Sequence, residues 1–205
     1  LWATQVGDHR FDDRLPIVTL ESQQKQLQAR EAFLKRLQQI DRAKLARSDQ
    51  INYDIFSRLT RQMIDEDGFQ SYLMPISGHS GFHVRFPELK HRARLKTLQD
   101  FENYITRLRG FNQYTSEHIE LMRTGMARRM VLPGIVFNDY QKAIQAHIVS
   151  DPEKSLLYAP FQKLPETLSQ VEQDGLRESA RLAIRNSVVP GYVKFLEFME
   201  KEYVP

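Results

Sequence analysis

The hydrophobic positions of this chain recur mostly every three or four residues, which is the period of an amphipathic α-helix. From Leu20 to Ile40 a sparse apolar stripe lies on a segment rich in Gln, Arg and Lys, and Thr19 stands where a helix N-cap is expected. After Ser48 a second stripe repeats every four residues, at Ile51, Ile55, Leu59 and Met63. These two segments predict a pair of antiparallel helices.

The segment from Asp65 to Lys96 breaks this pattern, because its apolar residues follow no sustained period. It is punctuated by Gly68, Pro75, Gly78, Gly81 and Pro87. Segments of this length without regular structure are usually functional or disordered in compact domains, and the apolar content here argues against disorder. We therefore expect one long ordered loop, in which residues 70–76 could form a short strand.

Helical patterns resume after this loop. Thr97 and Asp100 have the spacing of a capping box and mark the start of a long helix. Pro133 fits the first turn of the next helix, and Pro165 opens another, which Pro190 kinks or divides. The closing apolar stripe consists of Val193, Leu196, Met199 and Tyr203.

Together these patterns predict an all-α protein, an irregular bundle of five to seven helices with one long ordered loop. Hydrophobic residues make up 41% and charged residues 27% of the 205 residues, which is typical of a globular chain. No internal repeat, low-complexity tract or linker divides it, so we expect residues 1–205 to be a single helical region. No run approaches the roughly 20 consecutive apolar residues that predict a transmembrane segment.

Charge and cysteine content exclude several classes of function. The chain has 29 basic and 26 acidic residues, a balance that does not predict binding of nucleic acid. Its densest basic run, residues 90–96, could attract phosphates or a carboxylate-bearing ligand, but it is more often a solvated surface and lacks interleaved aromatic residues. The absence of cysteine excludes disulfides, thiolate nucleophiles and cysteine-containing zinc sites.

No self-sufficient catalytic centre can be identified, because the chain contains neither a glycine-rich phosphate loop nor a Gly-x-Ser-x-Gly elbow. His79 and His83 have a suggestive spacing of four residues, which on a helix would direct both rings at one metal. Their segment is glycine-rich and lacks the Glu that follows the first His in zinc proteases. The favoured interpretation is a shaped loop that lines a cleft. We predict no catalytic or metal-binding residue, and a ligand contacted by His79, Gly81, His83 and Arg85.

A second charged cluster, residues 7–14, combines three carboxylates, two guanidinium groups and one imidazole. It invites an acid–base or metal interpretation. The structural interpretation is stronger, because Arg–Asp pairs commonly hold an N-terminal segment against a helical body.

Several stretches are familiar when they are taken together and in order. They are Trp2 to Pro16 (WATQVGDHRFDDRLP), Ile51 to Asp54 (INYD), Leu73 to Ser77 (LMPIS), Asp100 to Leu108 (DFENYITRL) and Glu202 to Pro205 (EYVP). In this series the chain resembles the N-terminal part of the bacterial family catalogued as domain of unknown function 885, and the resemblance covers essentially the whole sequence.

Members of that family are longer, mostly helical and often exported, frequently as lipoproteins, and are similar to zinc metallopeptidases of the gluzincin type. Their zinc motif, a His-Glu start followed by Pro-Gly-His, lies in the C-terminal half and is absent here. The resemblance therefore implies no cofactor in this chain, with zinc only in the full-length parent. It also implies an exported, periplasmic or outer-membrane-anchored lipoprotein with a lipid anchor upstream.

The functional expectation is an N-terminal helical region that forms one wall of a substrate cleft. The missing C-terminal half of the same protein would be its partner and a peptide its substrate, so the fragment alone would not be catalytic. The alternative is a stand-alone, non-enzymatic helical binding or scaffold module that uses the same loop to hold a partner.

Overall fold

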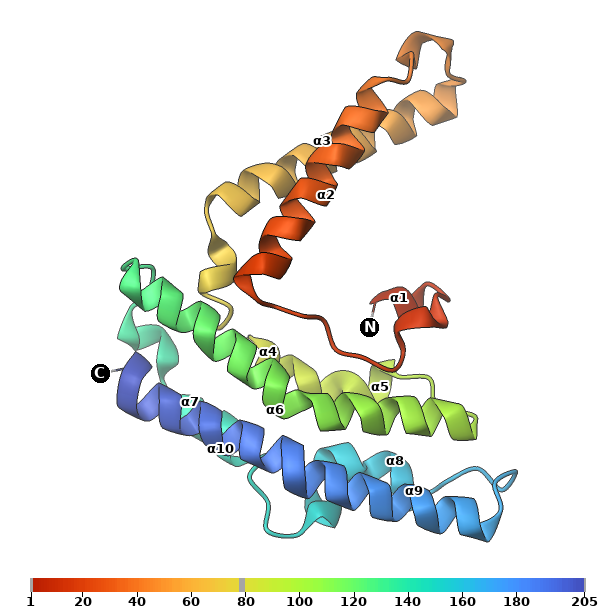
Figure 1. Cartoon of the computed structure of the whole chain (residues 1–205), viewed down its shortest axis with the longest axis vertical. Coiled ribbons are helices and arrows are strands. Elements are labelled where there is room, and N and C mark those ends of the chain that lie inside the picture. Colours follow the sequence, from red (N-terminus) through yellow and green to blue (C-terminus); the bar gives the residue numbers. More distant parts are fainter. Residues whose placement is uncertain (1, 78–79, 205) are drawn as a thin grey trace.

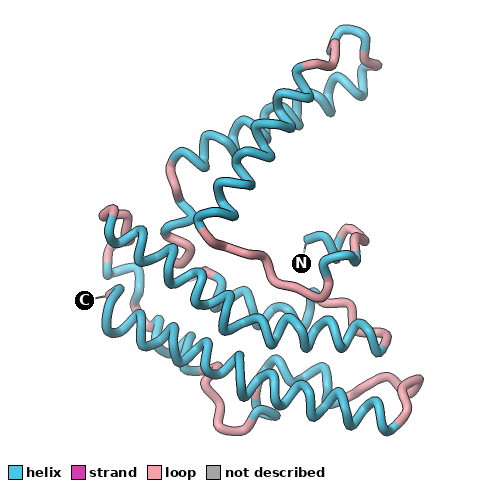
Figure 2. The backbone as a smooth tube through the Cα atoms, viewed as in Figure 1, coloured by secondary structure: helices cyan, strands magenta, loops and turns pink. Residues whose placement is uncertain are grey.

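The computed structural model describes residues 2–77 and 80–204. Within these two ranges the chain consists of helices and loops, with no strand (Figure 2). The all-α class predicted from the apolar periodicity is therefore confirmed. Figure 1 shows a helical hairpin that projects from a layered helical body. In the described ranges, no helix combines the length and the apolar character needed to cross a membrane.

The hairpin is formed by α2 (Leu20–Gln38) and α3 (Arg47–Gly68), which contact each other (Figure 1). A 3-10 turn, η2 (Arg42–Lys44), lies in the connection between them. The hydroxyl of Thr19 accepts a hydrogen bond from the amide of Ser22 at 3.2 Å, which confirms the predicted N-cap. Both predicted helices are thus present, with their boundaries within a few residues of those expected.

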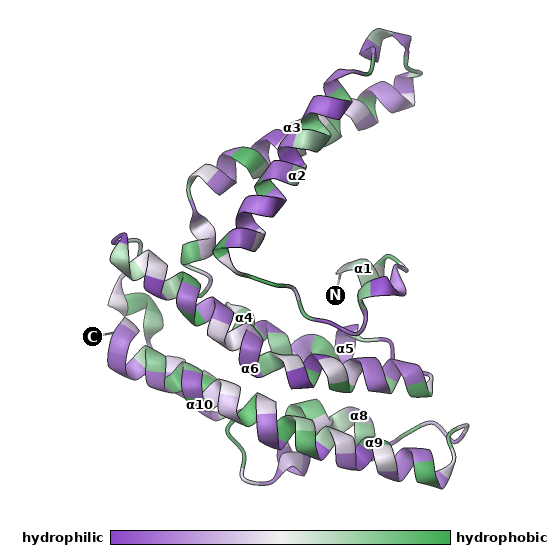
Figure 3. Ribbon diagram, in the orientation of Figure 1, coloured by the Kyte–Doolittle hydropathy of each residue, from purple (hydrophilic) through white to green (hydrophobic). Residues whose placement is uncertain are grey.

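The hairpin buries little apolar surface. Among its described residues none of α2 is buried, and in α3 only Thr60 is. Side chains that are 47–52% exposed form the predicted stripe on α3, namely Ile51, Ile55, Leu59 and Met63. Hydrophilic colours dominate α2 in Figure 3. Ion pairs contribute to the hairpin: Arg30 of α2 pairs with Asp67 of α3, and Arg42 of the connecting turn η2 pairs with Asp54 of α3.

The body is organised around α6 (Leu98–Ala127), its longest helix. Two helices pack against it, α9 (Gln170–Ala183) and α10 (Val189–Phe198). They are joined by a π-helical turn, Ile184–Val188, so that they form one continuous rod (Figure 1). A second π-helical turn, Met199–Tyr203, extends this rod toward the C-terminus.

Both α6 and α9 begin at a capping box. At α6 the box consists of Thr97 and Asp100, as predicted. At α9 it consists of Ser169 and Glu172, whereas the sequence analysis placed the start at Pro165. Pro165 lies in the turn before the helix instead. The Ser-x-x-Glu pattern supplies two partners for otherwise unbonded backbone N–H groups, and it determines where the helix begins.

Pro190 neither divides nor ends the rod. A proline removes a backbone donor and crowds the carbonyl of the preceding turn. Here the π-helical turn lies directly before it, with the amide of Val189 donating to the carbonyl of Ile184. Such a widened turn is a common way for a helix to absorb a local irregularity.

Aromatic side chains fill the interface between α6, α10 and the segment before α6. The Phe111 ring stacks on Phe86 at a centroid distance of 4.1 Å and lies 4.7 Å from the Tyr192 ring. The buried positions of α10 include Tyr192 and Phe195, one residue before the predicted Val193 and Leu196. The π-helical turn and the close approach at Gly191 account for the shift of the buried face. Met199 and Tyr203 are buried, as predicted.

The expected long loop is ordered but largely made of single helical turns. α3 continues to Gly68, and η3 (Ser71–Leu73), a 3-10 turn, replaces the short strand considered for residues 70–76. Beyond the undescribed residues 78–79, α4 (Phe82–Arg85), η4 (Phe86–Glu88) and α5 (Leu89–Arg92) follow in succession. Gln70 has a left-handed φ of 52°, which turns the chain away from α3 before an extended strand can begin.

Short elements complete the body. Pro133 precedes a 3-10 turn, η5 (Gly134–Phe137), rather than a long helix, and Asp139 with φ of 61° separates it from α7 (Tyr140–Gln145). The remaining elements are α1 (Trp2–Gln5), η1 (His9–Phe11), η6 (Pro152–Lys154), η7 (Leu156–Tyr158) and α8 (Ala159–Gln162).

Candidate functional site

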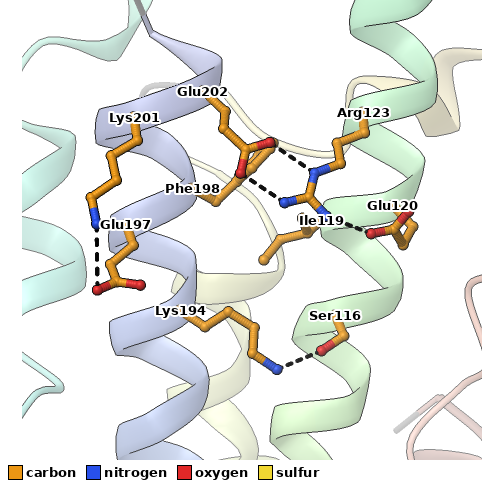
Figure 4. A pocket seen from close by; sticks show the side chains of 9 residues that line it. All are labelled: Ser116, Ile119, Glu120, Arg123, Lys194, Glu197, Phe198, Lys201 and Glu202. Carbon is orange, nitrogen blue, oxygen red and sulfur yellow. Dashed lines mark hydrogen bonds and ion pairs between the residues drawn. The ribbon is translucent and has the colours of Figure 1, made fainter.

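Several hollows of the described body contain charged side chains, and the first is a groove between α6 and α10 (Figure 4). Its charges are engaged with one another. Arg123 donates two hydrogen bonds to Glu202, at 2.8 and 2.7 Å, and one to Glu120 at 2.6 Å. The ammonium of Lys194 donates to the Ser116 hydroxyl at 2.8 Å (Figure 4). This groove is therefore a clamp that holds the two helices together.

The second hollow is a cavity of about 320 Å³ between the N-terminal segment, the turns around α4 and the helix α6. We call it the arginine cavity. Its lining residues are Arg14, Leu15, Pro16, Pro75, Gly81, Phe82, Arg85, Phe86, Arg92, Arg107, Tyr114 and His118. Three separate parts of the sequence thus meet at one site, and none of these described lining residues is acidic.

Arg107 fixes the N-terminal side of the arginine cavity. Its side chain is only 2% exposed and donates hydrogen bonds to the carbonyls of Phe11 and Arg14, at 3.0 and 3.2 Å. It also donates to the Thr4 hydroxyl at 3.3 Å and lies 3.5 Å from the carboxylate of Asp12. Burial lowers the pKa of Arg107, and the nearby Asp12 opposes this. An arginine of α6 therefore holds the segment that carries Arg14.

The charged cluster of residues 7–14 does have the structural role favoured from the sequence. Its internal pairs, Arg10 with Asp8 and Arg14 with Asp13, are local and exposed. The pair that reaches the body joins Asp12 to Arg107, which lies outside the cluster in sequence.

An aromatic wall closes another side of the arginine cavity. The His118 ring stacks on Phe82, with centroids 4.2 Å apart and planes 6° from parallel, and meets Tyr114 edge-on at 4.6 Å. Both ring nitrogens of His118 are buried and have no hydrogen-bond partner in the described part of the chain. Burial lowers the pKa of His118 to about 3, and the nearby His83 adds to this effect. The imidazole is therefore neutral at pH 7, with one donor and one acceptor unused.

Two guanidinium groups of the lining remain without an acidic partner. Arg14 pairs with Asp13 and Arg107 with Asp12, but neither Arg85 nor Arg92 lies within ion-pair distance of a carboxylate among the described residues. Burial raises the pKa of Tyr114 to about 12, while the positive charge of Arg85 lowers it. Arg85 and Tyr114 both line the arginine cavity.

The four residues predicted to contact a ligand fall into three groups. Gly81 and Arg85 line the arginine cavity. His83 is buried behind it, with an unpartnered Nδ1 and with its carbonyl accepting from Tyr192 at 2.8 Å. Burial lowers the pKa of His83 to about 4, with His147 contributing. His79 lies outside the described residues, and ligand contact stays a prediction for all four.

Gly81 has a positioning role at this site. Its φ of 149° lies in the region that favours glycine, and an added Cβ would lie 2.8 Å from Ile76 Cγ2 and 2.9 Å from His83 Nδ1. A side chain here would therefore displace the start of α4, which carries Arg85.

The sequence analysis missed Arg14, Arg107, Tyr114 and His118. The signal for three of them is the spacing of Arg107, Tyr114 and His118, seven and then four residues apart on one face of α6. This face also carries buried Phe111. Polar residues that interrupt an apolar stripe identify positions where a helix meets something other than a core.

No described group of three or more His, Asp or Glu side chains could hold a metal ion. Zinc in the full-length parent, which the family resemblance implies, stays a prediction.

Comparison with known proteins gives a family and a fold. No curated protein matches the chain. A crystal structure described as "the putative lipoprotein from Colwellia psychrerythraea" is similar, with a TM-score of 0.78 and 16% sequence identity over 93% of this chain. The match covers 34% of that protein's chain, so the present sequence spans about a third of its length. The family described as "Bacterial protein of unknown function (DUF885)" matches residues 1–205, and the chain therefore belongs to this family.

Proposed function

We propose that this chain is the N-terminal, non-catalytic helical region of an exported zinc metallopeptidase-like protein and that it forms one wall of the substrate cleft. The observation that carries the proposal is the arginine cavity, where unpaired guanidinium groups and apolar side chains converge on one hollow. Membership of the family and the greater length of the similar crystal structure support a larger parent protein.

In this proposal the chemistry and the binding belong to different parts of the polypeptide. Zinc held by the remaining part would polarise a peptide carbonyl and activate water. The described residues would bind and orient the substrate, with Arg85 and Tyr114 offering hydrogen-bond donors at the cavity. Because binding energy from remote parts of a substrate can accelerate a reaction, such a wall affects activity without touching the reacting atoms.

The experiment uses the complete gene product and a variant that fills the arginine cavity. Leu15 lines the cavity, so Leu15→Trp should raise the KM for a peptide substrate at least several-fold, because the indole occupies the space of the ligand. The matched control is Leu156→Trp, at a side chain that is half exposed and does not line the cavity. Thermal unfolding should show both variants folded.

Two outcomes would overturn this proposal in different parts. A complete gene product that hydrolyses no peptide in the presence of zinc and carries no His-Glu motif would end the peptidase assignment and favour a helical binding module. An unchanged KM in folded Leu15→Trp would end the assignment of the cavity to the cleft wall.

A further inference from the structure

The arginine cavity has an excess of positive charge that the described protein does not neutralise. Its lining contains four arginines and no acidic residue, and only Arg14 and Arg107 have aspartate partners. Besides these two aspartates, Glu117 acts on the site, because it raises the pKa of Tyr114. Its carboxylate is already engaged, because it accepts from the amide of Val18 at 2.9 Å. An anionic group in the cavity would therefore meet two available guanidinium groups.

The rest of the lining is mostly apolar. It consists of Leu15, Pro16, Pro75, Gly81, Phe82 and Phe86, together with the ring side chains of Tyr114 and His118. A volume of about 320 Å³ is at the small end for ligand sites, which suits a compact ligand or one side chain of a longer one. A simple inorganic anion would leave these apolar surfaces uncovered, so the occupant has an apolar body beside its charge.

The unused imidazole of His118 is a second, independent sign of a ligand. A polar group that is 93% buried normally has a hydrogen-bond partner, and leaving one without a partner destabilises the protein. His118 has none for either nitrogen in the described chain, although its ring forms part of the cavity wall. A neutral imidazole can donate to an oxygen atom without adding charge.

We propose that the arginine cavity binds the carboxylate of an organic acid with an aromatic or aliphatic body, such as the terminal or side-chain carboxylate of a peptide, with Arg85 and Arg92 as its charge partners. This inference rests on the proposed function and names the substrate class of the same site. A carboxylate matches the fork of a guanidinium group with two parallel hydrogen bonds. A carboxylate carries one negative charge, which the two unpaired guanidinium groups of Arg85 and Arg92 can neutralise.

The test compares an acid with its amide on the complete gene product. N-acetylphenylalanine should bind, while N-acetylphenylalaninamide, which lacks the charge, should bind at least about tenfold more weakly, since hydrogen bonds to charged groups are stronger than those between neutral groups. Isothermal titration calorimetry measures both affinities. Phenyl phosphate is the third probe, because it carries the same ring on a phosphate.

Variants locate the binding. Arg85→Gln should weaken binding of the acid about tenfold or more and leave the amide unchanged, while Arg85→Lys should retain part of the affinity. The matched control is Arg61→Gln at an exposed position of α3, which should change neither affinity. Equal binding of acid and amide, a preference for phenyl phosphate, no binding of the acid, or an unchanged Arg85→Gln would each overturn the inference. If one of these results is found while Leu15→Trp still raises the KM for a peptide, only the carboxylate assignment is wrong. The proposal that the chain forms one wall of the substrate cleft is then retained.

Discussion

His118 and His83 are buried imidazoles that the protein keeps neutral. Both lie near Phe82, whose ring stacks on His118 and meets His83 at 5.8 Å. Each has at least one buried nitrogen without a partner in the described chain. Their depressed pKa values therefore reflect burial first and the neighbouring histidine second. Protonation of either ring would place a positive charge among aromatic side chains with no acidic group to pair with it.

We predict that acid destabilises this protein between about pH 6.5 and pH 4. The unfolded chain binds protons on both histidines near 6.5, whereas the folded pKa values are about 4 for His83 and about 3 for His118. The stability that the two neutral histidines contribute is fully present above pH 6.5. It is lost as the pH falls through their pKa values in the folded protein. Urea unfolding at pH 7 and pH 4.5 should show a lower free energy of unfolding at the lower pH.

The variant His118→Phe provides the control for this pH effect. It retains the ring stacked on Phe82 and removes the titrating nitrogens, so the decrease in stability toward pH 4.5 should be smaller than in the unsubstituted protein. Stability at pH 7 should not fall by more than about 1 kcal/mol, because two unbonded polar atoms are removed. An unchanged pH dependence would show that other groups carry the acid sensitivity.

Individual site residues were predictable only where they lay close together in sequence. The glycine-rich segment pointed to Gly81 and Arg85, which do line the arginine cavity. Arg14 and His118 are over 100 positions apart, and only the fold brings them to one hollow. The burial of His83 could not be predicted from the sequence either, because it depends on packing against α10 through Tyr192 and Phe195.

At the level of elements, the contact between α6 and α10 depends on a missing side chain. A Cβ at Gly191 would lie 2.8 Å from Phe111 Cδ1 and 3.3 Å from Thr115 Oγ1. The Phe111 ring is enclosed between Phe86 and Tyr192 and cannot move away without disturbing both. The close approach of the two helices therefore requires glycine for space.

Gly191→Ala should lower the free energy of unfolding by about 1–3 kcal/mol, the usual cost of overpacking a filled core. The matched control is Gly175→Ala, in the exposed middle of α9, where an added Cβ meets nothing within 4 Å. That change should stabilise the protein by about 0.5–1 kcal/mol through the higher helix propensity of alanine. Chemical denaturation measures both, and a neutral Gly191→Ala would mean that α10 can shift freely along α6.

Elements were predictable where local chemistry defines them. The capping box at Thr97 and the N-cap at Thr19 located two helix starts, because a side chain bonds the first turn there. Errors arose where tertiary packing decides. The start of α9 was placed at Pro165 instead of Ser169, and the buried face of α10 was displaced by one residue at Tyr192.

For the molecule as a whole, the sequence predicted an all-α bundle but not its division into a body and a projecting hairpin (Figure 1). Apolar residues recur at helical spacing in both α3 and α6. In the structure Leu108 of α6 is fully buried, whereas Leu59 of α3 is 48% exposed. Periodicity identifies the apolar face of a helix, but it does not reveal whether the described chain covers that face.

The hairpin should therefore be the least stable part of this protein. Opening a segment costs free energy in proportion to the contacts it loses, and α2 and α3 have Thr60 as their only buried residue in the described structure. Hydrogen exchange followed by mass spectrometry should show rapid exchange in both helices and slow exchange in α6. Correspondingly, Leu59→Ala should cost less than about 1 kcal/mol and Leu108→Ala about 2–5 kcal/mol. Equal protection of α3 and α6 would show instead that hairpin and body unfold as one cooperative unit, which the packing within this chain does not explain.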